Sequence, residues 1–221
     1  MLWSGAPEAG LSAWNTEHTV SSSRISVATM AGRMAYRMEV DNGDNANGFG
    51  ERTELGQDGN SAKEFHNGDD VWQGYSVYLP GGFPTDANWT ALTQWKDIDP
   101  DLGSPSWGTY VEHGQIGVGG VLAGGDLGLF SRPAATDVWH NFVIHMKLGT
   151  SASTGSIDVY YSTGQTTPTL VYSGKRQTYR TAAKMVPRMG YYRDKSLALD
   201  AAVYHAGYAI GTSFDAVNPV N

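Results

Sequence analysis

Residues 71–79 read VWQGYSVYL, a run rich in β-branched and aromatic residues between two turn sequences, Asn67-Gly68-Asp69 and Pro80-Gly81-Gly82. A short run of this composition, bounded by Gly, Pro, Asn and Asp, is typical of a β-strand. Further β-rich runs between turn sequences occupy residues 24–30, 33–40, 139–147, 157–161, 169–172 and 201–210. The sequence shows no long stretch with a helical period. Only residues 178–184 could form one or two helical turns, which Pro187 would end.

Many short strands without intervening helices predict an all-β protein, a β-jelly roll sandwich of two antiparallel sheets. Residues 1–221 contain no internal repeat and no linker, which at this length favours one domain. Residues 97–105 include Pro100, Gly103 and Pro105 and are predicted to form a long loop at the rim of a sheet. Such loops often close over a cleft.

The chain carries 15 basic and 22 acidic residues, a formal net charge of −7. This balance argues against a nucleic-acid partner and confines any basic character to a cleft. Cysteine is absent, which excludes disulfides, thiolate zinc sites and cysteine nucleophiles. No apolar run is long enough to cross a bilayer, so we expect no membrane partner. The N-terminal residues lack a signal-peptide pattern, so the chain is either intracellular or secreted with its signal removed, and we expect a secreted monomer.

Three short segments each place functional side chains on one face of a strand: residues 50–55 (GERTEL), 92–96 (LTQWK) and 188–193 (RMGYYR). Alternate side chains of a strand point the same way, so each segment pairs two polar residues. The pairs are Arg52 with Glu54, Gln94 with Lys96, and Arg188 with Tyr192. Together they would form a floor of cations, one amide and one phenol. Such a floor suits an anionic substrate that loses a proton from carbon.

Five motifs follow one another along most of the chain: Arg52-Thr53-Glu54, residues 72–80 (WQGYSVYLP), Gln94-Trp95-Lys96, residues 139–143 (WHNFV) and residues 190–193 (GYYR). Each motif alone is a weak signal. As an ordered set they resemble the jelly-roll polysaccharide lyases of the glucuronan lyase and heparin lyase I group, and more distantly the family 7 alginate lyases. The resemblance implies a concanavalin A-like fold with a concave substrate groove. It also implies cleavage of an acidic, uronate-containing polysaccharide by β-elimination, which leaves an unsaturated uronate end.

The resemblance also implies roles for single residues. The alginate lyases carry Lys-Ala-Gly-x-Tyr in their late strand, and residues 188–192 keep the cation, the glycine and the tyrosine at that spacing, which makes Tyr192 the catalytic tyrosine. Arg52 and Gln94 would stabilise the charge that develops on the uronate carboxylate when the C5 proton leaves. Tyr192 would protonate the departing oxygen at C4, and its phenolate could first take the C5 proton. Glu54 would orient Arg52.

The other candidate residues are cations and histidines. Arg188 and Arg193 would bind the anionic substrate and, with Lys96, favour the ionised phenol. The family usually has a catalytic histidine where this chain has Lys96. Lysine ordinarily stays protonated at neutral pH, so Lys96 is either a fixed charge or a strongly perturbed base. His66, after the Arg52 strand, and His113, after Tyr110 in a strand that could border the cleft, are the alternatives that could reach it.

The remaining aromatic and histidine residues are interpreted mainly as structural. His18, His140, His145 and His205 would have structural roles. Tryptophans 72, 89, 95 and 107 offer flat faces for sugar rings, although Trp72 and Trp95 are expected to fill the core between the sheets.

No cofactor is expected. The sequence has no His-x-His or His-Glu-x-x-His pattern, which argues against a catalytic zinc. Asp41, Asn42 and Asp44 could bind calcium, although such residues more often form a hairpin loop. Related jelly rolls often hold calcium through an aspartate on the last strand, where this chain has His205.

Several alternatives remain open at the level of the sequence. Taken singly, Arg52 with Glu54 could be a surface ion pair, Gln94 a rim residue and Tyr192 a core tyrosine. The forms of the motifs favour glucuronan as substrate, with alginate second, and the few basic residues argue against heparin. A non-catalytic carbohydrate-binding module or lectin shares this architecture. A glycoside hydrolase would need paired carboxylates, and Glu54 has no evident partner in the sequence.

Overall fold

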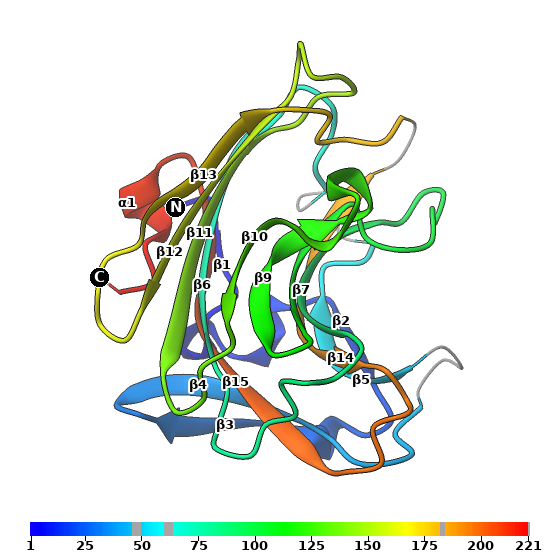
Figure 1. Ribbon diagram of the computed structural model, residues 1–221, viewed down its shortest axis with the longest axis vertical. Helices are drawn as coiled ribbons and strands as arrows, with labels where there is room; N and C mark the ends of the chain where they lie inside the picture. Colours follow the sequence, from blue (N-terminus) through cyan, green and yellow to red (C-terminus); the bar gives the residue numbers. More distant parts are fainter. Residues whose placement is uncertain (46–49, 60–63, 182–183, 221) are drawn as a thin grey trace.

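The computed structural model describes residues 1–45, 50–59, 64–181 and 184–220. Two antiparallel sheets lie face to face (Figure 1). Sheet A has the order β13-β12-β11-β6-β15-β4-β3, with β1 paired to β15. Sheet B has the order β10-β9-β8-β7-β14-β5-β2. The prediction of an all-β jelly roll of two antiparallel sheets is confirmed.

The strands are short. Sheet A consists of β1 (Trp3–Ser4), β3 (Ile25–Met30), β4 (Arg33–Val40), β6 (Asp70–Tyr78), β11 (Trp139–Lys147), β12 (Ser156–Thr163), β13 (Thr169–Lys175) and β15 (Ala201–Gly211). Sheet B consists of β2 (Thr16–Thr19), β5 (Glu51–Gly56), β7 (Thr90–Asp97), β8 (Trp107–Glu112), β9 (Gln115–Gly120), β10 (Gly125–Pro133) and β14 (Met185–Arg193). The strand runs read from the sequence agree with these bounds to within a few residues.

Helical structure in the described residues is limited to single turns. These are the 3₁₀ turns η1 (Pro7–Ala9), η2 (Leu11–Ala13), η3 (Ser22–Arg24) and η5 (Val121–Ala123), and the short helix α1 (Phe214–Val217). The predicted helical turn at residues 178–184 is wrong for its described part, which is irregular; residues 182 and 183 lie outside the described residues. Pro187 lies within β14, opposite Trp95. No helix in the described part of the chain is long and apolar enough to cross a membrane.

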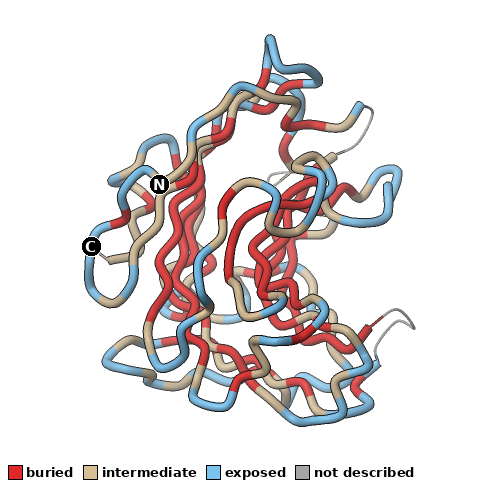
Figure 2. Tube along the Cα trace, in the orientation of Figure 1, coloured by how far each residue is buried: buried red, intermediate tan, exposed pale blue. Residues whose placement is uncertain are grey.

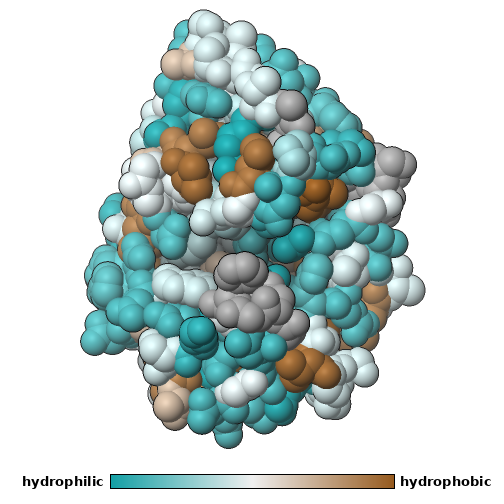
Figure 3. Space-filling model, turned by 90° about the vertical axis from the view of Figure 1, so that its right-hand side faces the viewer, coloured by the Kyte–Doolittle hydropathy of each residue, from teal (hydrophilic) through white to brown (hydrophobic). Residues whose placement is uncertain are grey.

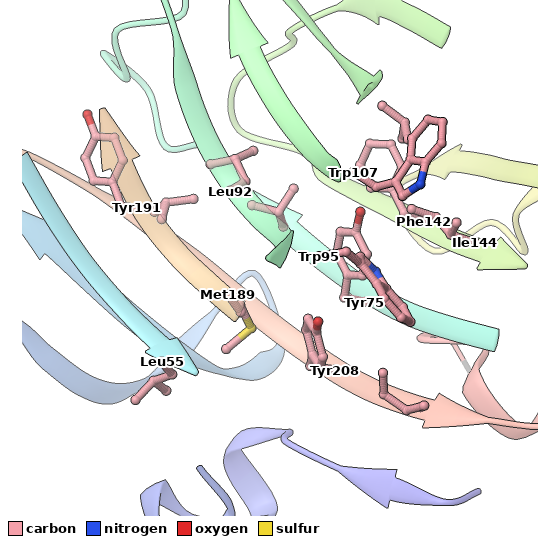
Figure 4. Close-up of a cluster of buried hydrophobic side chains, with 14 of the residues drawn as sticks. Leu55, Tyr75, Leu92, Trp95, Trp107, Phe142, Ile144, Met189, Tyr191 and Tyr208 are labelled. Atoms are coloured by element: carbon pink, nitrogen blue, oxygen red, sulfur yellow. The ribbon is translucent and has the colours of Figure 1, made fainter. Parts of the chain in front are cut away.

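Buried residues are concentrated in the strands of both sheets (Figure 2), and the inward-facing side chains of these strands form the core. Trp95, Trp107, Tyr75 and Phe142 extend into it, and Tyr191 joins them from β14 (Figure 4). Burying an aromatic side chain of this size stabilises the fold by about 2 kcal/mol or more. Since Tyr191 points inward, the alternation of a strand places its neighbour Tyr192 on the outer face of sheet B.

One core prediction needs correction. Trp72 does not fill the space between the sheets; it lies in β6 on the outer face of sheet A, partly buried, with its ring stacked on His145 at 4.1 Å. The alternation along β6 explains this, because Val71 and Gln73 are the neighbours that point inward.

Candidate active site

The outer face of sheet B carries a groove with a volume of about 810 Å³. Figure 3 views the molecule from the side on which sheet B lies and shows hydrophilic side chains over most of that face. The predicted residues Arg52, Gln94, Lys96, Arg188 and Tyr192 all line the groove. Residues that lie far apart in the sequence therefore meet on one surface.

Strand register brings four of these side chains together in two cross-strand pairs. Tyr192 of β14 pairs with Arg52 of β5, and Arg188 of β14 pairs with Gln94 of β7. The Arg52 guanidinium carbon lies 4.0 Å from the centre of the Tyr192 ring. Trp89 contacts the same ring edge-on, with 4.9 Å between centres. The phenol is thus held between a cation and an indole, and no described residue hydrogen-bonds to its hydroxyl.

Glu54 lies beneath this group and is only 1% exposed. One of its carboxylate oxygens accepts a hydrogen bond from the Gln94 amide, and the other lies 3.4 Å from an Arg52 terminal nitrogen. The Arg52 Nε has no hydrogen-bond partner among the described residues. A single carboxylate therefore accepts a hydrogen bond from the amide and forms an ion pair with the guanidinium, which holds both groups beside the groove.

Arg188 is held at the other side of the groove by Asp58. Its Nε and Nη2 donate to the two Asp58 oxygens at 3.1 and 2.6 Å, and the His18 Nε2 lies 2.8 Å from the same carboxylate. Burial raises the pKa of the Asp58 carboxyl, but hydrogen bonds from His18 and Arg188 outweigh it and hold that pKa below its usual value. Gly56 makes room for this cluster, because a Cβ there would lie 3.3 Å from Arg188 and from Asp58.

Lys96 holds the loop at residues 98–106, which forms one rim of the groove. Its ammonium donates to the Asp101 carboxylate and to the Gly103 carbonyl. Arg180 holds the same loop by donating to the carbonyls of Leu102 at 3.0 Å and Ser104 at 2.6 Å. The long rim loop predicted from the sequence is therefore present, and the Lys96 ammonium holds it through these two hydrogen bonds.

Replacing Lys96 with Met should loosen this loop. We expect protease cleavage within residues 98–106 to become roughly 10-fold faster, because both loop contacts of the ammonium are lost. Limited proteolysis followed by mass spectrometry measures the rate, and Lys147→Met, at an exposed position of sheet A, is the control. If Lys96 were instead the base, kcat would fall by about 10²-fold or more while the loop stayed as resistant as in the parent protein.

Three predicted site residues lie away from the groove. Arg193 is fully buried behind sheet B, where its Nε and Nη2 donate to Glu51 at 2.9 and 2.8 Å, so it cannot contact a bound polymer. It shares the inward face with Tyr191, which strand alternation requires. His66 is exposed in a turn before β6, and His113 is exposed in the β8–β9 turn. Neither histidine lines the groove.

Two of the histidines that were predicted to be structural, His18 and His205, lie in different surroundings. His18 was expected to be structural, but it lines the groove. His205 is fully buried; its Nε2 lies 2.8 Å from the Gly190 carbonyl, and burial lowers its pKa to about 4. A neutral, buried imidazole does not suit calcium, which prefers oxygen ligands.

The Asp41–Asp44 segment does not resemble a calcium site either. Arg24 forms ion pairs with Asp41 and Asp44, and Asp44 accepts from the Asp41 backbone N–H at 2.9 Å. The carboxylates are therefore already satisfied by the chain. In the described part of the chain, no cluster of three or more His, Asp or Glu residues could hold a metal ion.

Trp89, whose flat face the sequence offers for a sugar ring, lines the groove, whereas Tyr110 and Asp126 line it without having been identified from the sequence. The alternation of β8 could have indicated Tyr110, because Thr109 and Val111 on either side of it point into the sandwich. No local pattern points to Asp126, which reaches the groove through the path of β10.

The fold and the groove together define a jelly-roll protein with a polar groove on the outer face of one sheet. The sequence pattern of the family described as polysaccharide lyase matches residues 8–209. The chain therefore belongs to the polysaccharide lyase family, and the protein is an enzyme of that class. No curated protein sequence matches the chain.

Solved structures with a similar fold include lyases and hydrolases. An endo-β-1,4-glucuronan lyase from the fungus Trichoderma reesei has a TM-score of 0.68 and 16% identity, covering 93% of this chain and 94% of its own. A PL-14 alginate lyase from Aplysia kurodai has a TM-score of 0.64 and 14% identity, covering 92% and 93%. A GH131 β-glucanase catalytic domain from Podospora anserina has a TM-score of 0.70 and 15% identity, covering 100% and 99%. Identities this low show a shared fold alone.

Proposed function

We propose that this lyase cleaves a uronate-containing polysaccharide by β-elimination, with glucuronan as the first candidate substrate and alginate as the second. The observation that carries the proposal is the arrangement of Arg52, Gln94 and Tyr192 on adjacent strands of one groove. A guanidinium and an amide can bind the sugar carboxylate while the phenol handles protons. This is the chemistry that the elimination requires.

The elimination removes the C5 proton and breaks the bond between C4 and the glycosidic oxygen, which leaves a C4–C5 double bond. In the proposed reaction, the Tyr192 phenolate takes the C5 proton and the resulting phenol returns one to the departing oxygen. The Arg52 guanidinium carbon lies 4.0 Å from the centre of the Tyr192 ring, so both side chains face the same part of the groove. Negative charge that builds on the carboxylate is stabilised by Arg52 and Gln94, and one such donor is typically worth about 3 kcal/mol.

Glu54 supports this reaction without taking part in it. Its carboxylate is already shared between Gln94 and Arg52, so it holds two donors facing the groove. Lys96 and Arg188 contribute fixed charge at the rims, each paired with a carboxylate. The reaction is neither oxidative nor reductive, and we propose that it needs no cofactor.

Substrate and cellular setting are part of the same proposal. The Gln94-Trp95 pair and the Gly190-to-Arg193 segment resemble the glucuronan and heparin lyase group, and the similarity to the Trichoderma reesei glucuronan lyase fold agrees with that choice. A polymer substrate is met outside the cell, so we propose that the protein is secreted and acts as a monomer.

A substrate screen tests the proposal directly. Glucuronan, alginate and heparin are incubated with the protein, and the ultraviolet absorbance of the new double bond is followed. We expect the fastest rise with glucuronan, a slower rise with alginate and none with heparin. New reducing ends without absorbance would instead indicate hydrolysis, as in the GH131 β-glucanases that share the fold. Binding of a polymer without any cleavage would indicate a binding module.

A further inference from the structure

The end of the groove over β8, β9 and β10 holds two polar groups without partners. Tyr110 is only 3% exposed, and its hydroxyl has no hydrogen-bond partner among the described residues. The Asp126 carboxylate lines the same groove, and no described residue donates a hydrogen bond to it or forms an ion pair with it. Leaving a buried hydroxyl unpaired costs about 1–3 kcal/mol, so such a group is expected to serve a ligand.

The path of the chain explains why Asp126 reaches the groove. β10 pairs with β9 but shifts register between Gly125 and Phe130. Its backbone there closes over the outer face of β9, because Gly119 has no side chain: a Cβ on Gly119 would lie 2.5 Å from the Asp126 carbonyl oxygen. The glycine-rich sequence of β9 therefore positions a carboxylate as a wall of the groove.

Charge distinguishes this end from the rest of the groove. Elsewhere each cation faces a carboxylate: Arg52 with Glu54, Lys96 with Asp101, and Arg188 with Asp58. Asp126 has no such cation among the described residues. Burial and the nearby Glu112 raise its pKa to about 6, as expected for a carboxyl that lacks a positive partner.

These features oppose a second uronate carboxylate at this end and suit sugar hydroxyls. A second uronate would bring its carboxylate close to that of Asp126, which has no cation partner among the described residues and is partly shielded from water. Repulsion between the two like charges would be unfavourable. A sugar hydroxyl can donate to Asp126, and another can accept from Tyr110. We propose that this end of the groove is a subsite for an uncharged sugar residue, with Asp126 and Tyr110 as its binding residues.

This inference rests on the proposed β-elimination and extends its substrate class beyond glucuronan and alginate, which carry a uronate at every position. The preferred polymer would carry a neutral sugar next to the uronate that is cleaved, so that uronate and neutral residues occur in one chain. Tyr110 lies in the same cross-strand row as Tyr192, with Ala91 of β7 between them. The small Ala91 side chain lines the groove between these two positions.

The test compares two probes of equal length. One is a glucuronan oligosaccharide, and the other is the same material with about half of its carboxyl groups reduced to primary alcohols. Dissociation constants are measured by calorimetry in the Tyr192→Phe background, where turnover does not interfere. We expect the half-reduced probe to bind about 5- to 10-fold more tightly, because one like-charge contact is removed.

Substitutions at the two proposed binding residues test whether they cause the preference for the half-reduced probe. Asp126→Asn should abolish the preference by tightening glucuronan binding, whereas Tyr110→Phe should weaken binding of both probes by roughly 5-fold. The exposed Asp86→Asn, outside the groove, is the control and should keep the preference. Equal binding of both probes, or a preference that survives Asp126→Asn, would overturn the subsite. Absence of absorbing product from the parent protein would instead defeat the lyase proposal, and the binding result would still decide the subsite.

Discussion

Tyr192→Phe is expected to lower kcat by about 10²- to 10⁴-fold and to leave polymer binding almost unchanged. The substitution removes only the hydroxyl, which has no partner among the described residues. The ring remains for the Arg52 contact at 4.0 Å and the Trp89 contact at 4.9 Å. Product absorbance measures kcat, and calorimetry with a glucuronan oligosaccharide measures the dissociation constant.

The adjacent tyrosine provides a matched control. Tyr191 points into the core, where its hydroxyl accepts from Arg193 at 3.0 Å. Tyr191→Phe should therefore reduce the free energy of unfolding by about 1 kcal/mol and leave kcat nearly unchanged. If Tyr192→Phe kept the parent kcat, or if both variants lost it equally, the phenol of Tyr192 would not be the proton-transfer group.

Strand alternation made the central part of the site predictable from the sequence. Once residues 188–193 are read as a strand, Arg188 and Tyr192 must share a face and Tyr191 must take the other. The structure agrees, with Tyr192 in the groove and Tyr191 in the core. The same rule, applied to Arg193, places it behind the sheet with Tyr191. The prediction that Arg193 binds the substrate was therefore inconsistent with the strand alternation that correctly placed Tyr192 in the groove.

The outer parts of the site depend on pairing between distant segments, which local patterns do not contain. His18 reaches the groove because β2 pairs with β5, which puts His18 opposite Glu54. Asp126 arrives through an irregular strand that closes over Gly119. His66 and His113 do not line the groove for the same reason: proximity along the chain to a site strand did not bring the side chain to its outer face.

The pairing of the groove cations with carboxylates is the largest difference between the predicted site and the structure. The predicted cations Arg52, Lys96 and Arg188 line the groove, and each is paired with a carboxylate, of which only Glu54 was expected from the sequence. The formal charge of −7 is thus reflected within the groove itself. Paired cations are held in fixed geometry and contribute directed hydrogen bonds more than a strong long-range field. Recognition of the polymer is then expected to depend on position along the groove, which is the basis for the neutral subsite.

Arg52→Ala is expected to lower kcat/KM by about 10²- to 10³-fold, because it removes a donor to the carboxylate on which charge develops. It should also destabilise the fold by on the order of 3 kcal/mol, since Glu54 stays buried at 1% exposure without its cation. Urea unfolding measures the stability, and product absorbance measures the activity. The two effects have different causes and can be separated.

The double variant Arg52→Ala with Glu54→Gln separates the loss of activity from the loss of stability. Neutralising Glu54 should recover most of the lost stability, because no unpaired charge remains buried, while activity stays low. Arg37→Ala is the matched control: Arg37 pairs with Glu39 two residues away, as Arg52 does with Glu54, but on sheet A and outside the groove. Arg37→Ala should change the rate by no more than about twofold and the free energy of unfolding by no more than about 1 kcal/mol. Recovery of activity in the double variant would show that Arg52 only neutralises Glu54 and does not bind the sugar acid.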